Sequence, residues 1–199
     1  MILPHAEKCL LGDLADITAG HPLRSAVDEL PRGETGIVQM RNVDPDAGVV
    51  WPSVARVDLP PARRLDFLAE GQVIFSTRGT RTYAVALAEP PFPAVCSPHF
   101  FVLRVSEPDI DPRFLAWQIN QEAAQDYLQR EATGSHILNI RRDVVERLEI
   151  MIPSRARQVA IVAFAEAAAR EKRLLTDLIH NRQRQMRTLA AGLHDIGKD

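Results

Sequence analysis

A short basic segment contains the side chains with the clearest capacity for chemistry. Residues 76–82 read Ser-Thr-Arg-Gly-Thr-Arg-Thr, and they follow an apolar run that is typical of a β-strand. Arg78 and Arg81 could bind phosphates or pair with the acceptor edge of guanine, and Thr80 lies between them. The segment lacks the Gly-Lys-Ser/Thr ending of a phosphate-binding P-loop. Two interpretations remain open, a loop that contacts nucleic acid and a hairpin turn whose arginines are merely solvated.

Further polar clusters could support the same chemistry. Glutamine, arginine and asparagine side chains read adenine and guanine edges, whereas adjacent arginines clamp backbone phosphates. Adjacent arginines on a protein surface are usually just solvated, and this alternative applies also to the pair Arg141-Arg142. The clusters that we expect to contact a nucleic acid are Gln39, Arg41 and Asn42, then Arg63 and Arg64, and finally Ser135 and His136.

No complete catalytic set is recognisable along the chain. The Pro-Pro pairs at residues 60–61 and 90–91 lack the preceding Asp or Asn of an adenine methyltransferase loop. Asp66 and Glu70 lack the nearby lysine of a paired-carboxylate nuclease. His194-Asp195 copies the heart of an HD-phosphohydrolase motif, but no other histidine stands at metal-ligand spacing. We therefore expect a non-catalytic protein without cofactor or metal.

Charge is distributed unevenly along the 199 residues. Residues 1–154 carry 15 Lys+Arg and 21 Asp+Glu, a net charge of −6, whereas residues 155–199 carry 9 and 5, a net charge of +4. A nucleic acid would have to be held by a local patch or by partner proteins, because the larger part repels it. The two cysteines predict no disulfide framework, and we expect Cys96, like the nearby His99, to be buried in the core. Without an apolar leader or membrane span, the sequence predicts a cytoplasmic protein.

Two kinds of element must position these side chains. The first 110 residues alternate short β-branched or aromatic runs with turns, and a helix over residues 112–131 follows, with Asp111 as N-cap. A short helix over residues 141–147, capped by Asn139, and a strand over 148–152 complete this part. The runs predicted as strands are residues 36–40, 49–51, 72–76, 83–87 and 100–105.

The last part of the chain predicts one long helix over residues 154–196. Residues spaced alternately by four and three form a seam of the coiled-coil type. The alternative is an amphipathic helix folded back in two pieces near Lys172 or Gly192. The seam consists of Ile161, Ala165, Ala168, Lys172, Leu175, Ile179, Arg182, Met186, Leu189, Leu193 and Ile196, and its apolar members are the expected dimer or partner interface.

Several short motifs follow one another in a set order along the chain. They are LGDLADITAG at residues 11–20, IVQMRNV at 37–43, EGQVIFSTRG at 70–79, TGS at 133–135, LEIMIP at 148–153 and QVAI at 158–161. Their order resembles the Type I restriction-modification specificity (S) subunit family. Gln72 stands where that family usually has Asp, and Arg155-Ala156-Arg157 replaces more usual small or acidic residues.

The resemblance implies an α+β fold with two parts. A loop-rich, β-dominated target recognition domain over residues 1–153 precedes a coiled-coil helix over residues 154–199. Family members usually carry two such units and read a bipartite double-stranded DNA site, while their helices pair as a spacer that docks the methyltransferase (M) subunits and, through them, the restriction (R) subunit. This chain has one unit, so the resemblance implies a homodimer, or pairing with another half, and for a homodimer a palindromic target.

Two other functions remain as hypotheses. A coiled-coil protein–protein adaptor without direct DNA binding would suit the acidic residues 1–154. A small HD-type hydrolase would suit His194-Asp195 but lacks the remaining ligands.

Overall fold

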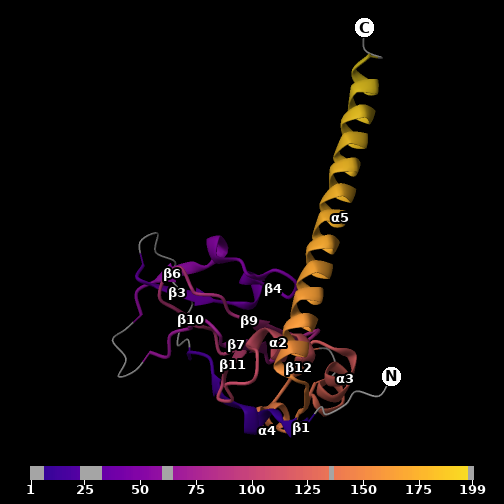
Figure 1. Cartoon of the computed structure of the whole chain (residues 1–199). Helices are drawn as coiled ribbons and strands as arrows, with labels where there is room; N and C mark the ends of the chain where they lie inside the picture. The colour runs from indigo at the N-terminus through magenta and orange to yellow at the C-terminus, as the bar shows by residue number, and fades with distance from the viewer. Residues whose placement is uncertain (1–6, 23–32, 60–64, 135–136, 197–199) are drawn as a thin grey trace. The chain divides into compact units, whose positions relative to one another are not determined.

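The computed structural model describes residues 7–22, 33–59, 65–134 and 137–196, with side chains in the last helix up to residue 191. The chain has the predicted α+β architecture, and it divides into two units, Met1–Val162 and Ala163–Asp199. We call the first unit the body (Figure 1). Four predicted contact residues lie outside the described residues, namely Arg63, Arg64, Ser135 and His136.

A four-stranded antiparallel sheet forms the centre of the body, because its strands are apolar on both faces. Phe75 and Leu103 face a core that the helices cover, whereas Ile74 and Phe100 face a second cluster on the other side. The order across the sheet is β2 (Ala15–Ala19), β11 (Phe100–Val105), β7 (Val73–Ser76) and β9 (Ala84–Ala86).

A three-stranded sheet lies beside the four-stranded sheet (Figure 1), and its Val38, Ala94 and Cys96 belong to the second cluster. Gly36 is required at its centre, since a Cβ there would come within 2.5 Å of the Phe92 ring. The ring also meets Trp51 edge-on, with centroids 5.6 Å apart. The order across the sheet is β10 (Ala94–Cys96), β3 (Thr35–Val38) and β6 (Ala55–Val57).

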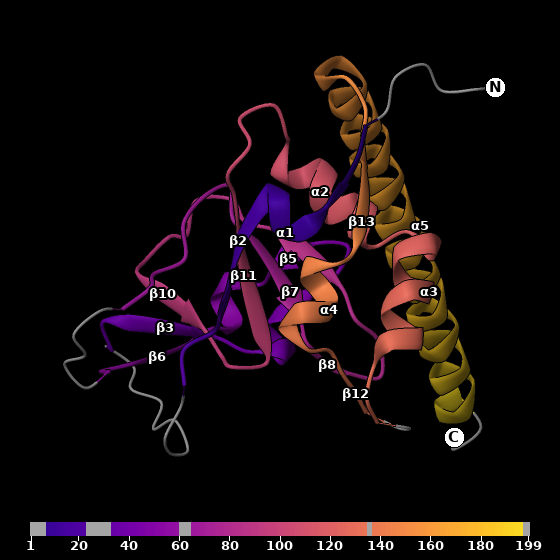
Figure 2. The same ribbon diagram turned by 90° about the horizontal axis from the view of Figure 1, so that it is seen from below.

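Three two-stranded ribbons and several single turns complete the β structure. Figure 2 shows β8 and β12 running side by side. The ribbons are β1 (Glu7–Leu10) with β13 (Glu149–Ile152), β4 (Val43–Asp44) with β5 (Gly48–Val49), and β8 (Arg78–Gly79) with β12 (Leu138–Asn139); the turns are α1 (Leu11–Leu14), η1 (Met40–Asn42) and η2 (Trp51–Ser53).

The predicted helix over residues 112–131 is wrong in one respect, because it is two helices. These are α2 (Pro112–Ile119) and α3 (Glu122–Glu131). Asp111 caps α2 as expected, with its side chain accepting a hydrogen bond from Arg113 N at 2.9 Å. The break falls at Asn120, whose side-chain amide instead bonds both backbone groups of Ala84 on β9. This tertiary contact outweighs the helical tendency of the flanking residues.

The short helix α4 (Arg142–Glu146) begins later than predicted, and its N-cap position is Arg141 rather than Asn139. Asn139 belongs to β12, where its backbone pairs with Arg78 and also with Thr133. Asn139, which the sequence suggested as the N-cap, is therefore engaged in strand pairing instead.

The last helix, α5 (Arg155–Ile196), is continuous over 42 residues, so the folded-back alternative is wrong. Ser154 stands at its N-terminal boundary, and its carbonyl accepts hydrogen bonds from Arg157 N and Gln158 N. Gln158 and Val162 are buried in the body. Among the described helices, none combines the length and apolar character that a membrane crossing requires.

Candidate nucleic-acid interface

The predicted basic segment is fastened at its base by buried hydroxyl residues. Ser76 Oγ accepts a hydrogen bond from Tyr83 N at 2.8 Å, which closes the two limbs of the segment. Thr77 donates through both N–H and Oγ1 to the carbonyl of His99, at 2.9 and 3.0 Å. Ile140 N donates to the Thr77 carbonyl at 2.8 Å. Ser76 and Thr77 therefore anchor the segment, and the residues after them are free to face outward.

Arg78, Thr80 and Arg81 are exposed. Arg78 and Gly79 form strand β8, which pairs antiparallel with β12 and lies in the connection between the antiparallel neighbours β7 and β9. Within the part of the chain that the structure describes, neither Arg78 nor Arg81 forms an ion pair. Two unneutralised guanidinium groups on a fixed backbone are suited to phosphate oxygens or guanine edges.

The turn η1 packs directly against this segment. A Cβ built on Gly79 would lie 3.0 Å from Met40 Cε, and Gly79 has a φ of +141°, so only glycine suits this contact. Gln39 is half-buried and Arg41 is exposed on the same turn. The structure thus brings together the first two clusters that the sequence indicated.

Asn42 occupies a different position from the one expected of a base-reading side chain. It is 1% exposed, and its Nδ2 donates to Ser53 O at 2.6 Å and to Ser53 Oγ at 3.1 Å. Its Oδ1 accepts from Gln39 N at 2.9 Å. Loss of these hydrogen bonds would leave a buried amide unsatisfied and destabilise the fold, so we infer that Asn42 holds the turn in place.

A third loop reaches the segment through β12. Thr133 and Asn139 exchange backbone hydrogen bonds at 2.9 and 3.1 Å, which closes the loop between them. Gly134 has a φ of +97°, and a Cβ there would meet the Ile137 carbonyl at 2.4 Å, so the turn requires glycine. Ile137 is 53% exposed. The positions expected at Ser135 and His136 lie inside this loop, outside the described residues.

The basic pair Arg141-Arg142 differs from the loop arginines. Arg141 Nη2 lies 3.3 Å from Asp143 Oδ2, and Arg142 Nε lies 2.7 Å from Glu146 Oε1. Glu146 thus pairs with Arg142, whereas Asp143 is shared between Arg141 and Arg147, whose Nη2 lies 3.0 Å from the same Oδ2. The structure therefore separates two groups of arginines that the sequence could not distinguish.

One basic residue escaped the sequence analysis. Arg56 on β6 is half-buried, with its guanidinium carbon 4.7 Å from the centroid of the Phe92 ring, and within the described residues it has no carboxylate partner. A stacked guanidinium is held in place at little entropic cost and keeps donors for an anion. The sequence offered no signal for it, because a single arginine in a strand is commonplace.

Two further expectations concern single residues of the body. Cys96 is 2% exposed, as expected, and burial raises the pKa of its thiol to about 12. His99, expected in the core, is instead exposed on the turn before β11, and its backbone carbonyl accepts the two hydrogen bonds from Thr77. Across the described residues, no three His, Cys, Asp or Glu side chains are placed to hold a metal ion.

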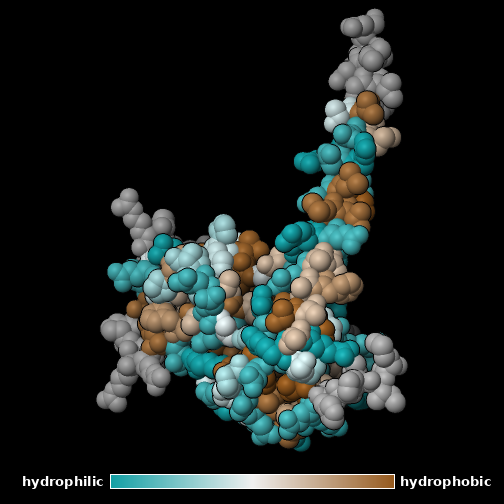
Figure 3. All heavy atoms as spheres, in the orientation of Figure 1, coloured by the Kyte–Doolittle hydropathy of each residue, from teal (hydrophilic) through white to brown (hydrophobic). Residues whose placement is uncertain are grey.

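The predicted seam on α5 presents an apolar face. Leu175 and Ile179 are 54% and 57% exposed, and Met186 and Leu189 are 66% and 64% exposed. Brown spheres mark apolar side chains of this helix in Figure 3. Ile161 and Ala165 are half-buried and Ala168 is exposed, whereas the side chain of Leu193 lies outside the described part.

Comparison with known families decides how the chain is classified. A profile described as the Type I restriction modification DNA specificity domain matches residues 7–180. The chain belongs to this family. The match extends from β1 into α5, so the specificity domain includes both the body and much of the long helix. No curated protein sequence matches the chain.

Solved structures show the same fold as this specificity domain. The HsdS subunit from Thermoanaerobacter tengcongensis is 22% identical over 95% of this chain and 48% of its own, with a TM-score of 0.66. The Type-I restriction-modification system S subunit from M. genitalium is 18% identical over 90% of this chain and 43% of its own, with a TM-score of 0.60. A third structure, described as the structural basis of complex assembly and conformational transition of the type I R-M system, is 16% identical over 95% and 44%, with a TM-score of 0.66. This chain spans less than half the length of all three.

Proposed function

We propose that this chain is a DNA-recognition unit of a restriction-modification complex, which reads one half of a bipartite site and docks the methyltransferase subunit. The observation that carries the proposal is that η1 packs on β8 through Met40 and Gly79, while Arg41, Arg78 and Arg81 of these two elements and the loop after β8 are exposed. Family membership supports DNA as the ligand, because the matching domain is a DNA specificity domain.

The apolar face of α5 supports the docking part of the proposal. Exposed leucine, isoleucine and methionine side chains over several helical turns are suited to a partner helix. The partner helix comes from a second copy or another specificity unit, and the pair provides the spacer between two half-sites. Each solved relative is about twice as long as this chain, which is consistent with two units in those proteins.

A second candidate function is an adaptor that binds proteins through α5 without contacting DNA. The net charge of −6 over residues 1–154 favours it. A fluorescence-anisotropy titration with random duplex DNA, with and without the methyltransferase subunit, discriminates the two. A DNA-recognition unit gains salt-dependent affinity when the methyltransferase is added, since that subunit supplies positive surface. No gain in affinity above that of the methyltransferase alone would favour the adaptor.

Methylome sequencing of cells that carry Arg78→Ala or Arg81→Ala tests the recognition surface itself. An arginine that pairs with guanine contributes roughly 1–3 kcal/mol of discrimination, so its loss relaxes one position of the motif. An arginine on a phosphate lowers methylation uniformly and reduces the salt slope by about one. Arg142→Ala is the matched control, because the guanidinium of Arg142 is already paired with the Glu146 carboxylate at 2.7 Å. If both loop variants methylate the same motif at the same occupancy as the control, the assignment of this loop to DNA is wrong.

A further inference from the structure

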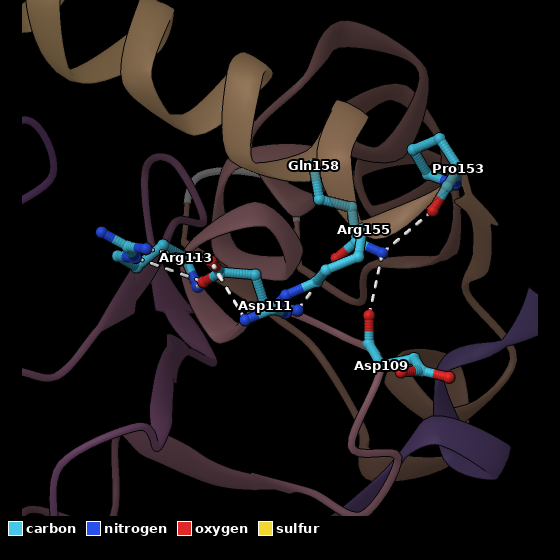
Figure 4. A network of polar contacts seen from close by, with 6 residues as sticks. All are labelled: Asp109, Asp111, Arg113, Pro153, Arg155 and Gln158. Atoms are coloured by element: carbon cyan, nitrogen blue, oxygen red, sulfur yellow. Dashed lines mark hydrogen bonds and ion pairs between the residues drawn. The ribbon is translucent and has the colours of Figure 1, made fainter.

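Helix α2 runs between two sets of buried polar contacts, and the first set ties it to α5. Gln158 is 1% exposed, and its Oε1 accepts a hydrogen bond from Asp111 N at 2.9 Å. Its Nε2 donates to the carbonyls of Asp109 and Pro153, both at 3.0 Å. Figure 4 shows this side chain reaching from the first turn of α5 to the chain just before α2.

The carboxylate of Asp111 strengthens the same junction. It caps α2 through Arg113 N at 2.9 Å and accepts a further bond from Arg113 Nη2 at 3.0 Å. Arg155, the first residue of α5, places its Nη2 at 3.6 Å from the same carboxylate. The Asp111 side chain is 3% exposed, whereas those of Arg113 and Arg155 are 56% and 49% exposed, so a buried carboxylate meets two guanidinium groups that reach solvent. The start of α5 is thus joined to the start of α2 through two side chains.

The second set of contacts ties the other end of α2 to the candidate recognition segment. Asn120 Oδ1 accepts from Ala84 N, and its Nδ2 donates to Ala84 O, both at 2.8 Å. Gln125 Nε2 donates to the carbonyl of Ile119 at 2.8 Å, while its Oε1 accepts from Thr82 Oγ1 at 2.9 Å. Thr82 closes the segment that holds Arg78 and Arg81. Side chains at and just after the α2–α3 break therefore hold both Thr82 and Ala84, which follow closely after Arg81.

The helix between the two sets is short and tightly packed. Its eight residues extend roughly 12 Å. Phe114, Leu115 and Ile119 are at most 1% exposed. A close-packed interior transmits displacement instead of absorbing it, so a shift at one end is felt at the other.

We propose that α2 couples the recognition segment to the first turn of α5, with Gln158 and Asn120 as the positioning residues at its two ends. Both side chains make their hydrogen bonds within the body. Gln158 fixes the first turn of α5 on the body, and Asn120 fixes the limb that sets the position of Arg81. The biological meaning of the coupling rests on the proposed function, but the coupling itself is a property of the DNA-free chain.

Two backbone amides report on the two ends separately. Asp111 N–H is bonded to Gln158, and Ala84 N–H is bonded to Asn120. Hydrogen exchange of the full chain, read at single-residue resolution by NMR, is measured for Gln158→Leu and for Asn120→Leu. Each variant raises exchange at its own amide. Coupling predicts that it also raises exchange at the remote amide, by roughly tenfold, the effect of a lost buried hydrogen bond.

The matched control is Gln72→Leu. Gln72 is also buried, at 8% exposure, and its Oε1 accepts a backbone hydrogen bond from Ala69 N at 3.1 Å, but it belongs to neither set. The Gln72→Leu variant raises the exchange rate of the Ala69 amide and leaves the exchange rates of the Asp111 and Ala84 amides within about twofold of the wild type. Gln158→Glu, which keeps the acceptor for Asp111 N but loses the donor to both carbonyls, serves if Gln158→Leu does not fold.

Strictly local changes in the Gln158 and Asn120 variants would overturn the coupling, as would an equal rise at both reporters in Gln72→Leu. Failure of the proposed function has a different signature, because it appears in the methylation motif of Arg78→Ala and Arg81→Ala and leaves these exchange rates untouched.

Discussion

Helices α2 and α5 both carry an apolar face, but their apolar side chains lie in opposite environments. Phe114, Leu115 and Ile119 of α2 are buried against the central sheet, whereas Leu175 and Ile179 of α5 are more than half exposed. Spacing by three and four identifies an apolar face without saying what covers it. Length separates the two cases, since a helix of 8 residues can be covered by the body and a helix of 42 cannot.

The difference also locates where each helix contributes free energy. Burial of apolar area in α2 stabilises the fold of the chain itself, at about 25 cal/mol per Å². The same type of surface on α5 contributes to association. Variants on the two helices should therefore change different measured quantities, and three predictions test this separation.

The largest expected effect is on association through α5. Burial of a leucine or isoleucine contributes roughly 1.5–3 kcal/mol, so Leu175→Glu combined with Ile179→Glu weakens self-association or partner binding at least about a hundredfold. Analytical ultracentrifugation and a methyltransferase pull-down measure this loss. The unfolding free energy of the body stays within about 0.5 kcal/mol of the wild type, because both residues are exposed in the single chain.

His180→Glu combined with Thr188→Glu is the control for added charge, since both residues lie on the same helix away from the predicted seam. This variant retains the oligomeric state and the partner. An unchanged mass and an unchanged pull-down for the Leu175 and Ile179 variant would mean that the seam is not an interface.

The next effect is on the stability of the body. Phe114→Ala removes a ring that is 1% exposed and costs about 3–5 kcal/mol of unfolding free energy, because it leaves a cavity against the sheet. Phe164→Ala removes a ring of the same type that is 78% exposed on α5, and its cost stays within about 0.5 kcal/mol. Urea denaturation followed by circular dichroism measures both. Similar costs for the two variants would contradict the comparison.

Much of the fold could be predicted from local pattern. The runs at β7 and β11 are continuous apolar strands bounded by turn residues, and α5 lacks an internal breaker other than Gly192, so these elements were predicted within one or two residues. The α2–α3 break was missed because its cause is tertiary. Nothing near Asn120 in the sequence indicates that its amide will bond β9, which lies 36 residues away.

The candidate interface was only partly predictable for the same reason. Arginine and glycine composition indicated the segment around Arg78, but only the structure shows that Met40 packs against Gly79 and joins two distant clusters. Composition also could not distinguish Asn42, which is buried, from Arg41, which is exposed. Whether a polar side chain faces solvent or closes a turn depends on contacts that a one-dimensional pattern does not contain.

The smallest predicted effect concerns the charge at the junction of α2 and α5. Burial alone would raise the pKa of Asp111, but hydrogen bonds from Arg113 and the nearby charges of Arg113 and Arg155 outweigh it, so the pKa is lowered from 3.8. A carboxyl group with a lowered folded-state pKa stabilises the fold above its unfolded-state pKa, and that contribution is lost as the pH falls through 3.8 toward the folded-state value.

Asp111→Asn keeps an N-cap but removes the charge, so it lowers the unfolding free energy by about 1 kcal/mol at pH 7. This value is near the lower end for a buried charged hydrogen bond, because both arginines are about half exposed. The difference in unfolding free energy between wild type and Asp111→Asn narrows as the pH is lowered from about 5 to about 3, roughly the range in which a carboxyl group titrates. It narrows because only the wild type has a charge at this position to lose. Urea denaturation at a series of pH values measures this narrowing. Arg113→Met removes the partner that lowers the pKa and flattens the pH dependence. A difference that stays constant or grows on acidification would show that the Asp111 charge does not stabilise the junction.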